Sequence, residues 1–108
     1  MRRITLADFE IANDRPLTII SGPCQLEGVD HSLMIAEKLA KACADHGANF
    51  IFKGSFDKAN RTSLSGKRGL GIDEGLRVMQ EVKSQLGCPV ITDIHTADQC
   101  APVAEVVD

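Results

Sequence analysis

Basic side chains are concentrated in one stretch of this chain, positions 53–71. Five bases face one acid there, Asp57, a net charge of +4, whereas the 108-residue chain as a whole carries −3 at pH 7. An arginine can bind phosphate oxygens in a bidentate manner, and lysines act as compact positive charges. The bases are Lys53, Lys58, Arg61, Lys67 and Arg68. Their clustering predicts a site for a small phosphorylated anion.

A solvated charged loop is the alternative interpretation of this stretch, and two observations favour binding. No hydrophobic period recurs between residues 54 and 71, and an irregular segment of that length in a compact domain is usually functional or disordered. Lys53 directly follows the apolar run Phe50–Phe52. The end of a strand would hold its side chain partly buried.

Cys24, Lys53, Asp93 and His95 each lie at or just after the carboxyl end of a short apolar run. The three runs are 17–20, 50–52 and 90–92. Thiolate, ammonium, carboxylate and imidazole groups can bind metals and anions or move protons. Strand ends are therefore the second place where this sequence gathers chemically capable side chains.

Amphipathic segments alternate with the apolar runs. The periodicity predicts a helix from Asp30, as its N-cap, to His46, and a second helix from Ile72 to Leu86. Residues 96–99 have the form of a capping box for a third helix, which Pro102 is expected to shorten or kink. Residues 106–108 have the pattern of the opening of a fourth strand.

Strands that alternate with helices predict parallel pairing through right-handed crossovers. Nearly continuous apolar runs predict that both faces of the sheet are covered. In a (β/α)8 barrel every strand delivers its carboxyl end to one shared mouth, whereas an open doubly wound sheet concentrates its chemistry at one switch point. Reactive residues at all three strand ends favour the barrel.

No G-x-G-x-x-G follows the first run, and Gly69–Gly71 is an incomplete version of it that opens the second helix. Amides at such a helix start can face an anion. We therefore predict an α/β chain and a TIM (β/α)8 barrel, of which this chain covers about the first three βα units and the start of the fourth strand. Residues 1–16 are an N-terminal extension, and 17–108 form the barrel portion.

Composition excludes several classes of function. A net charge of −3 with no Trp or Tyr and four Phe argues against a nucleic-acid surface. No apolar run approaches a signal peptide or the roughly 20 residues of a membrane span, so we expect a cytoplasmic protein without membrane contact. The four cysteines are scattered, which argues against a disulfide framework or a structural zinc site.

Four segments together resemble the 3-deoxy-D-manno-octulosonate 8-phosphate synthase family. The most specific is Phe52–Ser63, FKGSFDKANRTS; the others, in the same order as in the family, are Ser21–Cys24, Thr92–His95 and Ala101–Asp108. This resemblance implies a TIM-barrel enzyme that condenses phosphoenolpyruvate with D-arabinose 5-phosphate in lipopolysaccharide biosynthesis. Inorganic phosphate is the second product.

The resemblance also implies which residues bind phosphoenolpyruvate. Lys53 and Lys58 would bind its carboxylate and phosphate, with Ser55 near them. Its methylene carbon would attack the sugar aldehyde, water would add at the neighbouring carbon, and phosphate would leave through carbon–oxygen cleavage. Cations that stabilise the moving charge and the pairing of two reactants would supply much of the rate.

By the same resemblance, Asn60, Arg61 and Thr62 would hold arabinose 5-phosphate, Arg61 chiefly at the phosphate. Asp93 would contact sugar hydroxyls, and His95 lies near it. The resemblance names no general base, so Asp93 and His95 both stay candidates for a catalytic role. A purely orienting or structural role for His95 stays open.

Members of the family divide by metal requirement at the position of Cys24, where metal-dependent enzymes carry cysteine and metal-independent ones asparagine. The resemblance thus implies a divalent metal ion bound by Cys24 and by a histidine, a glutamate and an aspartate beyond residue 108. It implies no organic cofactor, and it implies a homo-oligomer, a tetramer. The sequence leaves the identity of the metal open, and a buried, inert thiol is the alternative.

Two other functions stay open. The related synthase that uses erythrose 4-phosphate, 3-deoxy-D-arabino-heptulosonate 7-phosphate synthase, also has Gly-Pro-Cys on its first strand. Its loop reads Lys-Pro-Arg-Thr-Ser, whereas this chain inserts Ala59-Asn60 before Arg61, which favours the five-carbon sugar. A noncatalytic phosphate-binding fragment is the other alternative, because three or four strands leave an exposed parallel edge that favours association.

Overall fold

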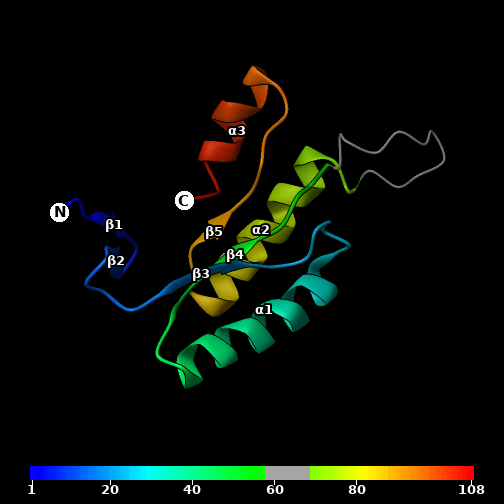
Figure 1. The fold of residues 1–108 in the computed structure, drawn as a ribbon. Coiled ribbons are helices and arrows are strands. Elements are labelled where there is room, and N and C mark those ends of the chain that lie inside the picture. Colours follow the sequence, from blue (N-terminus) through cyan, green and yellow to red (C-terminus); the bar gives the residue numbers. More distant parts are fainter. Residues whose placement is uncertain (58–68) are drawn as a thin grey trace.

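A computed structural model describes residues 1–57 and 69–108 of the chain. A small antiparallel hairpin comes first, and a parallel sheet with its crossover helices follows (Figure 1). The elements are β1 Ile4–Leu6, β2 Phe9–Ile11, β3 Thr18–Ser21, α1 Val29–Asp45, β4 Asn49–Lys53, α2 Ile72–Leu86, β5 Val90–Ile91, a 3-10 turn η1 Ala97–Gln99, and α3 Cys100–Ala104.

The parallel sheet has the strand order β3-β4-β5, so chain order and spatial order agree. Ser21 pairs with Phe52, and Phe52 pairs with Val90, in a row near the carboxyl ends of the strands. Helix α1 connects β3 to β4, and α2 connects β4 to β5. The predicted alternation of parallel strands and crossover helices is confirmed.

The core lies between the sheet and the two long helices, which contact each other as well as the strands. Alternate strand residues point to opposite faces, and Phe50, Phe52 and Val90 belong to the buried cluster on the helix side. From α2 come Val78, Met79 and Val82, and from α1 Ala36 and Cys43. The apolar stripes of both helices thus pack on one face of the sheet.

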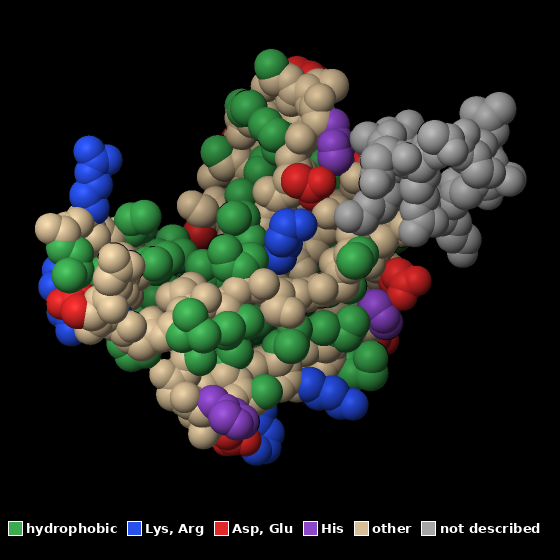
Figure 2. Space-filling model, in the orientation of Figure 1, with side chains coloured by type: hydrophobic (Ala, Val, Ile, Leu, Met, Phe, Trp, Pro, Cys, Tyr) green, Lys and Arg blue, Asp and Glu red, His purple; other side chains and the backbone are tan. Residues whose placement is uncertain are grey.

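The opposite face of the sheet is only partly covered among the described residues, where Ile51, the partner of Ile20, is 4% exposed. Ile20 is 52% exposed and Ile91 36% exposed, although both lie in strands. Figure 2 shows hydrophobic side chains gathered at the surface across the middle of one face of the molecule. The expectation that both faces are covered is therefore wrong for the described part, because both helices that cover the sheet lie on its other side.

Helix boundaries follow the sequence pattern closely, with one correction. Helix α1 begins at Val29 after Gly28, whose φ is 142°. The prediction that Asp30 is the N-cap is wrong, because the N-cap is Gly28. Asp30 lies in the first turn, where its negative charge interacts favourably with the helix dipole. Helix α2 has the predicted bounds and ends at Gly87, which adopts the left-handed conformation.

The C-terminal residues form the predicted capping box, in which Gln99 Oε1 accepts a hydrogen bond from the Thr96 amide. Helix α3, which contains Pro102, is five residues long. Residues 106–108 do not form a strand, so the predicted opening of a fourth strand is not observed. Asp108 nevertheless lies beside β5, because its amide donates to the carbonyl of Val90 at 3.0 Å.

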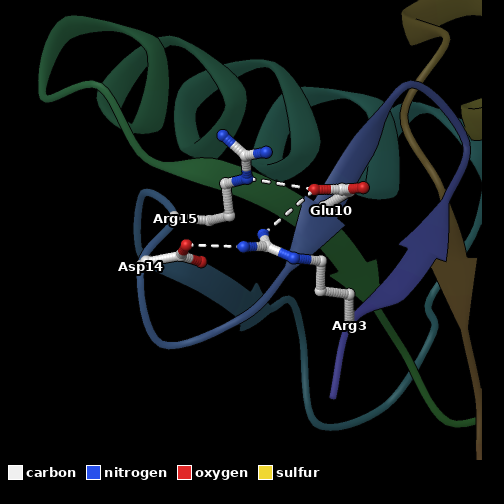
Figure 3. A network of polar contacts seen from close by, with 4 residues as sticks. All are labelled: Arg3, Glu10, Asp14 and Arg15. Atoms are coloured by element: carbon white, nitrogen blue, oxygen red, sulfur yellow. Dashed lines mark hydrogen bonds and ion pairs between the residues drawn. The ribbon is translucent and has the colours of Figure 1, made fainter. Parts of the chain in front are cut away.

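Residues 4–11, within the stretch 1–16 that was predicted only as an extension, form a hairpin. Its strands β1 and β2 pair antiparallel across a turn at Ala7, which has a φ of 51°. Figure 3 shows how the hairpin is tied to the segment before β3: Arg3 bonds Asp14 at 2.6 Å, and Glu10 Oε2 accepts from Arg3 and Arg15. Such partly exposed ion pairs add little stability each.

Helix α2 carries a glycine whose replacement tests its packing. A Cβ at Gly75 would overlap the Cβ of Phe56, which is 2% exposed. Alanine normally favours a helix over glycine by about 1 kcal/mol, but overpacking costs about 1–3 kcal/mol. We expect Gly75→Ala to lower the free energy of unfolding by about 1 kcal/mol in urea denaturation.

Gln85→Ala, at an exposed position of α2, is the control for this substitution. It is expected to change the free energy of unfolding by less than about 0.5 kcal/mol. A stabilised Gly75→Ala variant would contradict this packing.

Candidate functional site

The carboxyl ends of β3 and β4 approach each other unusually closely. A Cβ at Gly22 would overlap the carbonyl oxygen of Lys53. Only glycine permits this approach. Gly22, in the motif Ser21–Cys24, therefore fixes the first strand end against the second, a role that the sequence analysis did not assign.

The ends of β4 and β5 are joined by hydrogen bonds. The Thr92 hydroxyl donates to the carbonyl of Gly54 at 2.7 Å, and the Gly54 amide lies 3.4 Å from the carbonyl of Ile91. Ser55 is fully buried, and its carbonyl accepts from the Leu26 amide at 2.9 Å. These contacts hold the carboxyl ends of β3, β4 and β5 together in one layer of residues around Ser55.

Asp93 lies within this layer. Partial burial raises the pKa of its carboxyl group, but a hydrogen bond with the Ser55 side chain, one with its own backbone, and the charges of Lys53 and His95 outweigh that effect. The pKa of Asp93 is therefore lower than usual, and the group is a carboxylate at neutral pH. None of the described residues donates a hydrogen bond to its Oδ1, which is shielded from solvent.

His95 connects the end of β5 to the start of the basic stretch. Its Nε2 lies 2.7 Å from the carbonyl oxygen of Asp57 and 3.7 Å from Asp93 Oδ2. Its ring meets the ring of Phe56 edge-on, with centroids 6.0 Å apart. No pattern in the sequence indicates the contact with Asp57, which lies 38 residues away along the chain.

The structure therefore brings together four of the residues that the sequence singled out. They are Lys53, Ser55, Asp93 and His95. Figure 2 shows basic, acidic and histidine side chains close together on the face that carries the exposed hydrophobic residues. The other proposed substrate ligands, Lys58, Asn60, Arg61 and Thr62, lie outside the described residues.

Cys24 lies on the segment after β3 and is exposed with a free thiol. Residues 1–57 and 69–108 contain no group of three or more His, Cys, Asp or Glu side chains that could hold a metal ion. The described residues thus offer Cys24 as one candidate ligand and do not form a metal centre by themselves.

A hollow at the other end of the sheet does not coincide with this chemistry. It has a volume of about 480 Å³ and is lined by Thr5, Phe9, Arg15 and Asn49, among others. These residues belong to the hairpin, to the segment before β3 and to the amino end of β4. In open parallel α/β sheets and in barrels, ligands bind at the carboxyl ends of the strands, so the layer around Ser55 is the better candidate site.

The fold and the site define an α/β protein with a polar cluster at the carboxyl edge of a parallel sheet. The chain belongs to the DAHP synthetase I family, whose model matches residues 3–108. Curated relatives named 2-dehydro-3-deoxyphosphooctonate aldolase are 56% identical in Rickettsia bellii, and 51% identical in Rickettsia canadensis and in Rickettsia prowazekii. Each match spans 105 residues, which is 97% of this chain and 38% of the relative.

The name of these relatives is another name for 3-deoxy-D-manno-octulosonate 8-phosphate synthase. The resemblance that the sequence motifs indicated is thus confirmed. The chain spans well under half the length of the curated relatives that it matches.

The hydrogen bond between Ser55 and Asp93 can be tested by titration. We expect Ser55→Ala to raise the pKa of Asp93, because the carboxylate loses a donor while its desolvation remains. Ionised Asp93 stabilises the fold above the pKa of the unfolded chain, about 3.9, and that stabilisation is lost as pH falls through the lower folded pKa. Stability should therefore fall less steeply between about pH 5 and 3 in the variant. NMR titration of the carboxyl group measures the shift.

Ser32→Ala is the matched control for that titration. Ser32 is also fully buried, but its hydroxyl has no hydrogen-bond partner among the described residues. Its removal is expected to leave the pKa of Asp93 unchanged and to be neutral or stabilising, because an unpaired buried hydroxyl is costly. Equal effects of the two substitutions on Asp93 would contradict the assigned hydrogen bond.

Proposed function

We propose that this chain serves in an enzyme that condenses phosphoenolpyruvate with D-arabinose 5-phosphate to give 3-deoxy-D-manno-octulosonate 8-phosphate and inorganic phosphate. The observation that carries the proposal is the meeting of Lys53, Ser55, Asp93 and His95 at one edge of the parallel sheet. The name of the relatives, 2-dehydro-3-deoxyphosphooctonate aldolase, supports it. The net charge of +4 in residues 53–71 suits two phosphorylated substrates.

Lys53 and Asp93 have complementary tasks in this proposal. The ammonium group of Lys53 binds the carboxylate or phosphate of phosphoenolpyruvate, together with Lys58 from the undescribed segment. Asp93 is ionised and accepts hydrogen bonds from the sugar hydroxyls. Its Oδ1 has no donor among the described residues, and an unpaired carboxylate oxygen shielded from water is costly, so a donor on a ligand is favoured there. Ser55 holds the carboxylate in place.

In the proposed reaction a carbon–carbon bond forms between the methylene carbon of phosphoenolpyruvate and the aldehyde carbon of the sugar. The aldehyde oxygen takes up a proton, water adds at the former enol carbon, and the carbon–oxygen bond to phosphate breaks to leave a ketone. Lys53 stabilises the negative charge that develops and departs. Asn60, Arg61 and Thr62 orient the sugar phosphate, so that both reactants meet in one geometry. Asp93 is the candidate for proton transfer.

The proposed architecture is a closed (β/α)8 barrel of about 250 residues. In such a barrel the face that carries Ile20 and Ile91 points to the interior, which accounts for apolar side chains that are 52% and 36% exposed here. We also propose a cytoplasmic homo-oligomer, a tetramer, that binds neither nucleic acid nor membrane. No helix in the described part of the chain is long and apolar enough to cross a membrane.

Condensation with erythrose 4-phosphate is the second candidate, because the matching family model is described as the DAHP synthetase I family. The insertion Ala59-Asn60 and the names of the relatives favour the five-carbon sugar. A noncatalytic phosphate-binding fragment is the third. It is favoured by the exposed apolar side chains of Ile20 and Ile91 on one face of the sheet.

The substrate proposal can be tested with the protein isolated at its native length, whose mass is measured first. We expect phosphate release from phosphoenolpyruvate with arabinose 5-phosphate and little with erythrose 4-phosphate. Lys53→Met is expected to lower kcat/KM by on the order of a hundredfold, the scale of about 3 kcal/mol for a lost charged hydrogen bond. Lys41→Met, which removes an exposed lysine paired with Asp45 on α1, is the control. Preferential use of erythrose 4-phosphate would refute the assigned sugar.

Metal dependence through Cys24 is a separate proposal. A thiolate suits a divalent transition metal, and the other ligands would come from beyond residue 108. We expect a chelator to abolish activity, and Cys24→Ser to lower both the metal content of the purified protein and its activity. Cys100→Ser, which also removes an exposed free thiol, should change neither. Full activity of the Cys24→Ser variant in the presence of chelator would show that no metal is needed.

A further inference from the structure

The two described ends that flank residues 58–68 meet at Phe56. The Gly71 amide donates to the carbonyl of Phe56 at 3.1 Å, and a Cβ at Gly69 would overlap that same carbonyl oxygen. Gly69 has a φ of 129°, which favours glycine. We call residues 56–57 and 69–71 the neck. The two segments on either side of residues 58–68 are thus in direct contact.

One side of the neck is anchored in the core. The Phe56 side chain is 2% exposed and lies so close to Gly75 of α2 that a Cβ at that glycine would overlap the Cβ of Phe56. Asp57, the next residue, is only half-buried. Its position therefore depends on polar contacts, among them the one from His95 to its carbonyl oxygen.

His95 holds the neck from the end of β5. Its Nε2 lies 2.7 Å from the carbonyl oxygen of Asp57, and a carbonyl can only accept, so Nε2 must carry the hydrogen. In the neutral ring this leaves Nδ1 unprotonated. The His95 amide in turn donates to Gln99 Oε1 at 2.8 Å, which fixes the turn that carries the ring. The capping box at Thr96 thus also orients this histidine.

We propose that His95 is a positioning residue, which fixes the Asp57 carbonyl through a ring protonated at Nε2 and thereby holds the neck at the edge of the site. The contact between His95 and the Asp57 carbonyl does not depend on the proposed function. Its consequence for catalysis rests on the proposed function, in which Lys58 binds phosphoenolpyruvate. Asp93 Oδ2 at 3.7 Å from the same Nε2 lies beyond hydrogen-bond distance. The carbonyl of Asp57 is therefore the partner that fixes the ring.

Three substitutions separate positioning from the alternatives. Glutamine places its Nε2 donor at the same number of bonds from Cα as the Nε2 of histidine, but it cannot act as a base at neutral pH. Phenylalanine keeps the edge-on ring contact with Phe56 and lacks the donor. Asparagine keeps an amide that is too short to reach Asp57. Positioning predicts that His95→Gln behaves like the natural protein, whereas His95→Phe and His95→Asn do not.

In kinetic terms, we expect His95→Phe and His95→Asn to raise KM for phosphoenolpyruvate by roughly two- to tenfold, the range for one neutral hydrogen bond, with a smaller change in kcat. His95→Gln should stay within about twofold of the natural protein on the same scale. A fall in kcat in all three variants, with loss of one limb of the pH profile, would make His95 an acid–base catalyst and overturn the proposal. Normal kinetics of His95→Phe would reduce the role to ring packing and also overturn it.

A second measurement does not depend on activity. We expect ¹⁵N NMR to show the His95 ring protonated at Nε2, and hydrogen exchange at the Gly71 amide to accelerate in His95→Phe but not in His95→Gln. His46 is an internal reference for the ring, because its Nδ1 lies 2.9 Å from the carbonyl of Ala42 and must carry its hydrogen there. His46→Phe is the control for exchange and should leave Gly71 unchanged.

The two measurements distinguish the two ways of being wrong. Unchanged exchange at Gly71 in His95→Phe, or a neutral ring protonated at Nδ1, would overturn the positioning role even if the enzyme condenses the expected substrates. Faster exchange in a protein that turns over neither sugar phosphate would keep the contact with Asp57 and refute the proposed function.

Discussion

The parallel register of β3, β4 and β5 is the constraint on which the candidate site depends. Ser21 pairs with Phe52, and Lys53 pairs with Ile91, so all three strands end at one edge. The polar residues that follow those strand ends therefore lie at the same edge of the sheet. Gly22 makes this edge tight, because any side chain there would overlap the carbonyl of Lys53. A slip of one residue in this register would turn Lys53 to the helix side and place Phe52 in the site.

The electrostatics of the site follow from that placement. Lys53 ends β4, and Asp93 follows the adjacent strand β5. The fully buried Ser55 forms a hydrogen bond with the carboxylate of Asp93. Desolvation alone would favour a neutral acid at position 93, yet the hydrogen bonds and the nearby charges outweigh it, so the carboxylate persists. The edge thus offers a cation for an anionic ligand and an anion for hydroxyl groups. The cation suits the phosphate and the anion suits the hydroxyl groups of the phosphorylated sugar in the proposed function.

Local signals made much of the fold predictable. Helix α2 has the bounds that its apolar stripe and Gly87 indicated, whereas the three-residue strands of the hairpin were too short to show a period. The N-cap of α1 was misassigned because Asp30 is a common capping residue, but Gly28 precedes it. Site membership was predictable because strand ends converge. The contact of His95 with Asp57 was not, since it joins residues 38 positions apart through a turn whose direction only the packing sets.

The partly covered sheet face and the partial site are two consequences of the same geometry. Ile20 and Ile91 lie on the face opposite the helices, as does Lys53, which is paired with Ile91. Exposed apolar area of this kind costs free energy at about 25 cal/mol per Å², and it lies next to polar groups whose proposed partners are anions. Closure of the proposed barrel would cover the isoleucines and, by the same movement, enclose Lys53 and Asp93 in a medium of lower dielectric constant. Hydrophobic burial would then strengthen the electrostatic interactions on which binding depends. The sheet face whose exposed isoleucines cost free energy is thus the face that the proposed chemistry requires to be covered.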